Sequence, residues 1–156
     1  MKHLKDILTE AIKISSKSKV NDYKYQPKTR KELYALIHRK LIKERGEDAD
    51  LNDINTSEIT DMHSLFLNSR FTGDISGWDV SNVTDMKSMF RNSLFDGDLS
   101  KWDVSKVKTM DMMFDNSKFT GKNGDISNWN VSNVKDMKSM FDWCPLEKNP
   151  PKWYNE

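Results

Sequence analysis

Two sets of side chains, all but one acidic, recur at fixed intervals, and stacked carboxylates could hold a metal ion. The positions are Asp74, Asp98 and Asp125 in one set, and Asp79, Asp103 and Asn130 in the other. Ca²⁺ favours oxygen ligands of this kind. Alternatively, each Asp accepts backbone N–H groups at its own turn. We favour the turn role, because the sequence contains no Asp-x-Asp-x-Asp or glycine-rich calcium repeat. No metal and no other cofactor is predicted.

Other residues that commonly carry chemistry are scattered. His3, His38 and His63 are far apart in sequence and lack ligand-spaced partners, so no zinc site is expected. Cys144 is the only cysteine, which rules out an internal disulfide. We find no glycine-rich phosphate loop and no nucleophile elbow. The sequence therefore predicts a protein that is not an enzyme and has no catalytic residues.

A repeated unit positions the acidic side chains. Residues 73–90 read GDISGWDVSNVTDMKSMF, and closely similar runs occupy 97–114 and 124–141. Trp78 and Trp102 lie 24 residues apart, and the next spacing of 27 reflects a three-residue insertion in a glycine-rich loop. A unit of this length cannot bury its apolar face alone, so neighbouring copies are expected to stack around a shared core.

Within one copy, two spacings suggest two kinds of secondary structure. Trp78 and Val80 alternate with Gly77 and Asp79, which predicts a short strand with the apolar side chains inward. The apolar residues in 83–90 recur at intervals of three and four, the period of a helix with one buried face. Equivalent strands would pair in a parallel sheet. The predicted fold class is an α/β solenoid with a short parallel strand and a short helix in each repeat.

The repeated tryptophans have two possible roles. They could form a platform on which sugars or bases stack, or they could form the core. A buried Trp contributes about 4–6 kcal/mol as an upper bound, and the repeat contains few other large residues. We therefore expect the tryptophans to face inward.

The chain is predicted to have three segments. Residues 1–22 form an amphipathic helix and linker, serving either as a second cap or as a detachable address. Residues 23–48 contain a capping helix. Residues 49–156 form the repeat solenoid of about four coils, with atypical end copies that act as terminal caps.

The capping helix is expected over residues 28–45. Thr29 and Glu32 form a possible capping box, and Gly46 provides a stop. The apolar stripe consists of Leu33, Leu36, Ile37 and Leu41. This helix is expected to cover the open end of the first coil.

Charge is divided unevenly along the chain. The formal net charge is +1, but residues 1–48 hold 13 Lys and Arg against 7 Asp and Glu, whereas residues 49–156 hold 12 against 17. The basic segment could bind nucleic acid or an acidic partner, although a solvated helix face explains it equally well. Nucleic acid is not the expected partner, because the adjacent repeats are acidic. The sequence shows no secretory signal and no stretch that suits a membrane, so a cytoplasmic or virion location is predicted.

The repeat also resembles a known family. The spacing Ile75-x-x-Trp78-x-Val80-x-x-Val83-x-x-Met86-x-x-Met89-Phe90-x-x-Ser93 is similar to the BspA-type leucine-rich repeat. It resembles more narrowly the Mycoplasma-lipoprotein-like branch with the run GDISxWDVSNVTDM. The resemblance covers roughly residues 49–153. It implies a right-handed, leucine-rich-repeat-like solenoid that binds proteins or surfaces, with no catalytic residues to carry over.

Many members of that family are secreted or lipid-anchored surface proteins, whereas this chain has neither a signal peptide nor a lipobox cysteine. Short unsignalled proteins of this kind also occur in gut bacteria and their large phages. The resemblance thus leaves both a bacterial and a bacteriophage origin open.

The predicted function is a non-enzymatic, protein-binding repeat module. Outward positions of the predicted strands vary between copies whereas inward positions do not, which favours the outward face as the contact surface. The candidate binding residues are Gly77, Asp79, Lys101, Asp103, Asn128 and Asn130. The alternative is a phage virion or assembly accessory protein, tethered to a larger particle by residues 1–22.

Overall fold

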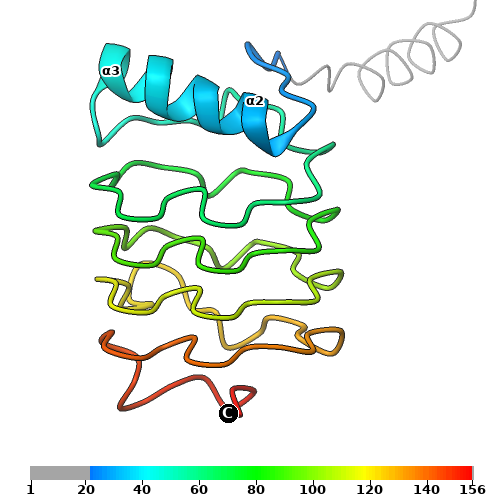
Figure 1. Cartoon of the computed structure of the whole chain (residues 1–156), viewed down its shortest axis with the longest axis vertical. Coiled ribbons are helices and arrows are strands. Elements are labelled where there is room, and N and C mark those ends of the chain that lie inside the picture. The colour runs from blue at the N-terminus through cyan, green and yellow to red at the C-terminus, as the bar shows by residue number, and fades with distance from the viewer. Residues whose placement is uncertain (1–21, 156) are drawn as a thin grey trace, which may run out of the picture.

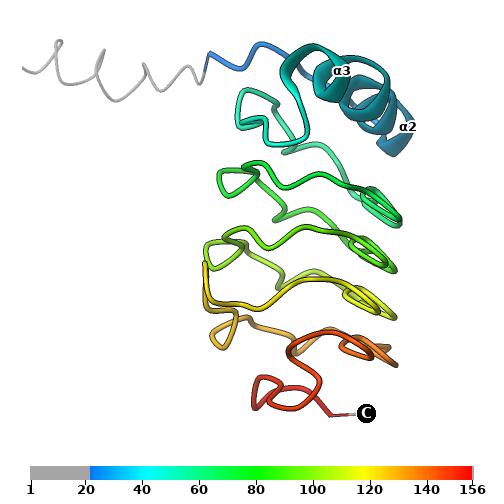
Figure 2. The same ribbon diagram turned by 90° about the vertical axis from the view of Figure 1, so that its left-hand side faces the viewer.

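The computed structural model describes residues 22–155. The helix predicted within residues 1–22 lies outside the described residues. Figures 1 and 2 show a series of coils stacked along the long axis, with one helix lying across the N-terminal end. The helix comprises α2 (Arg30–Ala35), the π-helical η1 (Leu36–Leu41) and α3 (Ile42–Arg45), which follow one another without a break.

The predicted α/β solenoid, with a strand and a helix in every repeat, is wrong. Residues 49–155 form no helix and no strand, and no sheet occurs in the described chain. Each copy is a succession of turns, and neighbouring copies meet at isolated parallel bridges. Along the repeats these bridges join Asp61 to Asp85, Asp85 to Thr109, and Thr109 to Asp136.

Turns replace the predicted elements because a spacing of three also suits a β-turn, whose ends are hydrogen-bonded. Three such turns follow one another in the copy that begins at residue 73. Their bonds run from Trp78 N to Ile75 O (3.1 Å), from Val83 N to Val80 O (2.9 Å), and from Met89 N to Met86 O (3.2 Å). The first and last residue of each turn are buried. The apolar spacing therefore marks turn ends and not a helix face.

Residues with positive φ exclude a helix from the second half of each copy. Ser88 has φ 53° and Asn92 has φ 54°, in the left-handed region that α-helices do not contain. The equivalent residues in other copies are Ser64, Met112 and Ser139, and Asn68, Asn116 and Trp143. Positive φ at the third residue is typical of a type II turn. Asparagine adopts this conformation more readily than most residues.

Residues with positive φ alternate with residues of negative φ in this part of each coil, and this alternation directs peptide N–H groups toward the next coil. The N–H groups of Met86, Ser88, Phe90 and Asn92 donate to the carbonyls of residues 109, 111, 113 and 115 at 2.9–3.0 Å. The corresponding bonds form between the preceding and the following pairs of coils. Every second N–H in this part of a coil is therefore bonded to a neighbour, in one direction along the stack.

Aromatic side chains fill the interior. Trp78, Trp102 and Trp129 are 3–5% exposed, so the prediction that they face inward is confirmed and the stacking platform is excluded. Each indole N–H donates to a carbonyl of the preceding coil, as from Trp102 to Ile75 at 3.2 Å. The second aromatic column consists of Phe66, Phe90, Phe114 and Phe141, whose rings lie 5.5–5.8 Å apart and within 4° of parallel.

The predicted capping helix is present at nearly the expected bounds. The Thr29 hydroxyl accepts the N–H of Glu32 at 3.2 Å, and Gly46 ends the helix with φ 96°. Buried side chains from the helix, including Leu33 and Ile37, join the same core as the coils. The helix thus covers the apolar end of the stack.

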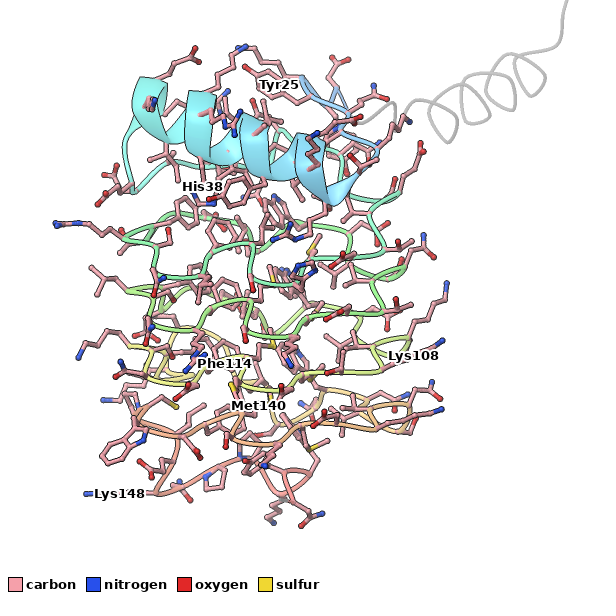
Figure 3. All side chains as sticks on the ribbon, in the orientation of Figure 1. Tyr25, His38, Lys108, Phe114, Met140 and Lys148 are labelled. Atoms are coloured by element: carbon pink, nitrogen blue, oxygen red, sulfur yellow. The ribbon has the colours of Figure 1, made fainter. Side chains whose placement is uncertain are left out.

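The helix also covers polar groups at the edge of the first coil. In later coils, the carbonyls of Lys87 and Met89 accept N–H groups from the preceding coil. The first coil has no such neighbour. Instead, Arg30 Nε donates to the His63 carbonyl at 2.6 Å, and His38 Nε2 contacts the Leu65 carbonyl at 2.7 Å. Figure 3 shows His38 on the side of the helix that faces the coils. The Arg30 and His38 side chains thus bond to carbonyls that, in later coils, accept N–H groups of the preceding coil.

Substituting Trp102 tests the aromatic interior. Trp102→Ala should lower the free energy of unfolding by about 3–5 kcal/mol, because it leaves a cavity. Trp102→Phe should cost about 1–2 kcal/mol, because a phenyl ring still fills most of the site but the indole hydrogen bond to the Ile75 carbonyl is lost. Urea denaturation measures both, with the exposed Trp143→Ala as the matched control. A loss below 1 kcal/mol for Trp102→Ala would contradict a packed tryptophan column.

His38 should make stability depend on pH. Burial lowers the pKa of His38 below its ordinary value of 6.5, although the bond to the Leu65 carbonyl opposes the shift. The unfolded chain therefore binds a proton more readily, and stability should decrease as the pH falls below about 6.5. His38→Gln keeps an amide donor but does not titrate, so its stability should vary less between pH 7.5 and 5.5. Equal pH slopes in the two proteins would exclude this role.

Candidate binding surface

The six predicted contact residues all lie on the surface, beside the buried tryptophans. They are Gly77, Asp79, Lys101, Asp103, Asn128 and Asn130, and each is exposed. They occupy the two positions that flank the tryptophan in three successive coils, as the repeat implies. Whether they contact a partner stays a prediction.

Three of these six residues hold their own turns together. The side-chain oxygens of Asp79, Asp103 and Asn130 accept the N–H of the serine two residues later, at 3.0–3.1 Å. The other ladder behaves in the same way, and Asp74, Asp98 and Asp125 each accept such an N–H at 2.8 Å. The turn role of the aspartates is therefore confirmed.

These bonds also favour the charged carboxylates. The pKa of Asp98 and Asp103 lies below its usual range because the hydroxyl and the N–H of the following serine donate to the carboxylate. For Asp74 the N–H of Ser76 is the main cause. Stability from these bonds is present above the ordinary carboxyl pKa of 3.8 and is lost as the pH falls through the lower folded pKa.

Gly77 is also fixed by its neighbours. Its N–H donates to Asn52 Oδ1 at 2.8 Å, and a Cβ at this position would lie 2.9 Å from that oxygen. Lys101 and Asn128 make no side-chain hydrogen bond within residues 22–155. Of the predicted set, these two side chains are the ones available to a partner.

A second surface was missed by the sequence prediction. Trp143 is 79% exposed and has φ 56°. The equivalent residues of earlier coils are asparagines, whose side chains form a ladder from Asn116 to Asn92 and from Asn92 to Asn68, each step 2.8 Å. Trp143 therefore stands at the end of an asparagine ladder, in a conformation that a bulky residue rarely adopts. Extending the alignment to this position would have found it.

A hollow of about 550 Å³ lies beside Trp143. Its lining consists of Arg91, Asn92, Met112, Asp115, Asn116, Ser139, Asp142 and Trp143. Arg91 Nε lies 2.7 Å from the largely buried Asp115 carboxylate in the next coil. Lys87 pairs in the same way with Asp111 at 2.8 Å, which raises the pKa of Lys87. The hollow thus combines an exposed indole with amide and charged groups.

One group of side chains in residues 22–155 has ligand atoms close enough to share a cation. Asp61, His63 and Asp85 lie within 4.8 Å of one another. The sequence prediction missed this group because Asp85 comes from the next coil. His63 Nδ1 is 2.8 Å from Asp61 Oδ1, and the parallel bridge between Asp61 and Asp85 brings the two carboxylates together. These contacts account for the arrangement without an ion, so we assign no metal here.

The stacked copies and shared core define a repeat protein. Comparison with known families matches residues 38–153 to the family described as "Mycoplasma protein of unknown function, DUF285", and the chain belongs to this family. The resemblance to Mycoplasma repeats is confirmed at that level. No curated protein and no solved structure matches the chain. Within residues 22–155, no helix has the length and apolar character needed to span a bilayer.

Substitutions of Asp103 test the turn role. Asp103→Ala should lower the free energy of unfolding by about 1 kcal/mol, because the Ser105 N–H loses its acceptor. Asp103→Asn should be nearly neutral, because Asn130 accepts the equivalent N–H in the next coil at 3.1 Å. Urea denaturation at pH 7 measures both variants. Equal losses for Ala and Asn would show that charge, and not the hydrogen bond, stabilises this turn.

Proposed function

We propose that this chain is a non-enzymatic, protein-binding repeat module whose main contact surface is centred on Trp143. The single observation that carries the proposal is the 79% exposure of this indole. Tryptophan is one of the residues most enriched at sites that dominate the energy of protein binding. An indole left in water contributes nothing to the core, so its position favours a role in contact with another molecule.

The backbone at Trp143 supports the same proposal. A non-glycine residue in the left-handed region costs on the order of 1–2 kcal/mol, least for asparagine. Earlier coils have asparagine here, and Trp143 replaces it despite the less favourable conformation. The N–H of Trp143 is held by the Glu147 carboxylate at 3.2 Å, which fixes the chain beneath the indole. Strain of this kind is typical of binding sites.

The surroundings of Trp143 suit a protein partner. The hollow beside it is about 550 Å³, large enough for one or two side chains. Asn116 is exposed at its edge, and the Arg91–Asp115 pair places both charges near the indole. An aromatic anchor surrounded by polar groups is the usual composition of a binding surface. The proposed partner is therefore a protein that inserts a side chain next to the indole.

The prediction for this surface is tested with Trp143→Asn. The variant should lose the partner while its melting temperature stays the same or rises, because asparagine suits the left-handed backbone. Affinity capture from native lysate, followed by mass spectrometry, compares wild type, Trp143→Asn and the control Leu94→Asn. Leu94 is also an exposed apolar residue, at 41%. Retention of the same partners by Trp143→Asn would overturn the proposal.

The surface predicted from the sequence provides a second arm of the same experiment. Lys101→Ala combined with Asn128→Ala removes the two predicted side chains that hold no turn. Loss of capture in this variant, together with retention in Trp143→Asn, would move the contact to that surface.

The assembly role remains a separate prediction, because it depends on residues 1–22. Deleting residues 1–21 should remove the protein from a particle but leave the coils folded. Normal incorporation of the shortened chain would exclude tethering by this segment.

A further inference from the structure

We propose that the C-terminal end of the coil stack binds a peptide segment of another protein, which adds to the stack as one further set of turns. The segment would supply backbone carbonyls to the N–H groups of Met137, Ser139 and Phe141, and a carboxylate to Lys138. This site adjoins the surface around Trp143, because Ser139 also lines the hollow there, but the proposal uses the backbone edge and not the indole.

Unpaired backbone donors form the basis of the proposal. In the preceding coil, the N–H groups of residues 110, 112 and 114 donate to the carbonyls of residues 136, 138 and 140 at 2.8–2.9 Å. The equivalent N–H groups of Met137, Ser139 and Phe141 have no acceptor within residues 22–155. These three donors point in the direction in which each coil bonds to the next. A peptide that supplies carbonyls at alternate residues would match them.

Residues 144–155 cover the last coil only in part. Trp153 and Tyr154 pack against Phe141, with ring centroids 6.1 and 5.0 Å away. Trp153 also donates its indole N–H to the Ile126 carbonyl at 3.0 Å. No backbone hydrogen bond joins residues 144–155 to the three unpaired donors. The aromatic part of the end is therefore covered, and the backbone edge is not.

Apolar side chains next to this edge are also uncovered. Val134 and Met137 are partly exposed, whereas the equivalent Val107 and Met110 are 0% exposed beneath the next coil. A hollow of about 530 Å³ is lined by residues 134–138 together with Asn155. Apolar contacts beside polar donors match the surface that one coil presents to another. They favour a peptide over a free anion.

The unpaired charge of Lys138 indicates the composition of the bound peptide. Lys138 occupies the position of Lys87, whose ammonium group pairs with Asp111 of the following coil at 2.8 Å. Lys138 is exposed and forms no ion pair within residues 22–155. A segment with an acidic residue directly after an apolar one, as in Met110-Asp111, would complete the same pair. The occupant is thus an apolar and acidic peptide.

A second copy of the chain does not suit this edge. The end of the stack that presents free carbonyls is its N-terminal end. There the helix covers the first coil, and Arg30 and His38 already bond to its carbonyls. Two C-terminal ends would bring N–H groups opposite N–H groups. The coils of a second copy therefore do not supply these acceptors, and we assign the site to a segment of a different protein.

The test uses a synthetic peptide with the sequence of residues 104–117, which makes these contacts with the preceding coil. In the free protein, NMR hydrogen exchange should be fast at Ser139 and slow at Met112. Adding the peptide should slow exchange at Met137 and Ser139, with Kd on the order of 0.1–1 mM, because ordering the free peptide costs free energy.

Charge variants provide the matched controls. Lys138→Glu should weaken peptide binding about tenfold, and a peptide with Asp111→Lys should restore it. Lys122→Glu, at an exposed loop position, should bind the peptide as wild type does. The proposal is overturned if Ser139 exchanges as slowly as Met112 in the free protein. It is also overturned if about 2 mM peptide leaves these amides unchanged, or if the peptide protects another surface.

Discussion

The fold depends on one set of interactions, the hydrogen bonds that join alternate backbone N–H groups of a coil to the carbonyls of the next. They form because residues such as Ser88 and Asn92 adopt positive φ between residues with negative φ. A helix would satisfy its N–H groups internally and would leave coils joined by side chains alone. Here the backbone itself links the copies, and the buried tryptophans and phenylalanines stack because the copies are held in line.

The repeat, the inward tryptophans and the N-terminal helix could be predicted, because each rests on a signal within one segment. The strand and the helix of each copy could not. Apolar residues three apart mark the ends of a β-turn as well as one face of a helix, and turns prevail because neighbouring coils offer acceptors. The asparagines at 68, 92 and 116 were the available sign of a left-handed backbone, since asparagine favours it.

The candidate surfaces also include features that one segment predicts and features that depend on neighbouring coils. The turn role of Asp103 followed from its residue type and the serine two positions later. Trp143 aligns with the asparagines of earlier copies, so an alignment extended to this position would have found it, although the spacing of apolar residues alone does not reveal it. The open edge at Ser139 depends on the direction of bonding along the stack, and only the assembled coils define that direction. The groups exposed at the ends of the stack are thus the part of the structure that one repeat cannot predict.

The N-terminal helix contacts the first coil through groups that do not depend on the number of coils behind it. Arg30 and His38 bond to the first coil through its carbonyls, which every coil presents in the same way. Duplication of a 24-residue unit inside the array would therefore leave both terminal structures intact. An array lengthened in this way would keep the same helix at one end and the same free backbone N–H groups of the last coil at the other.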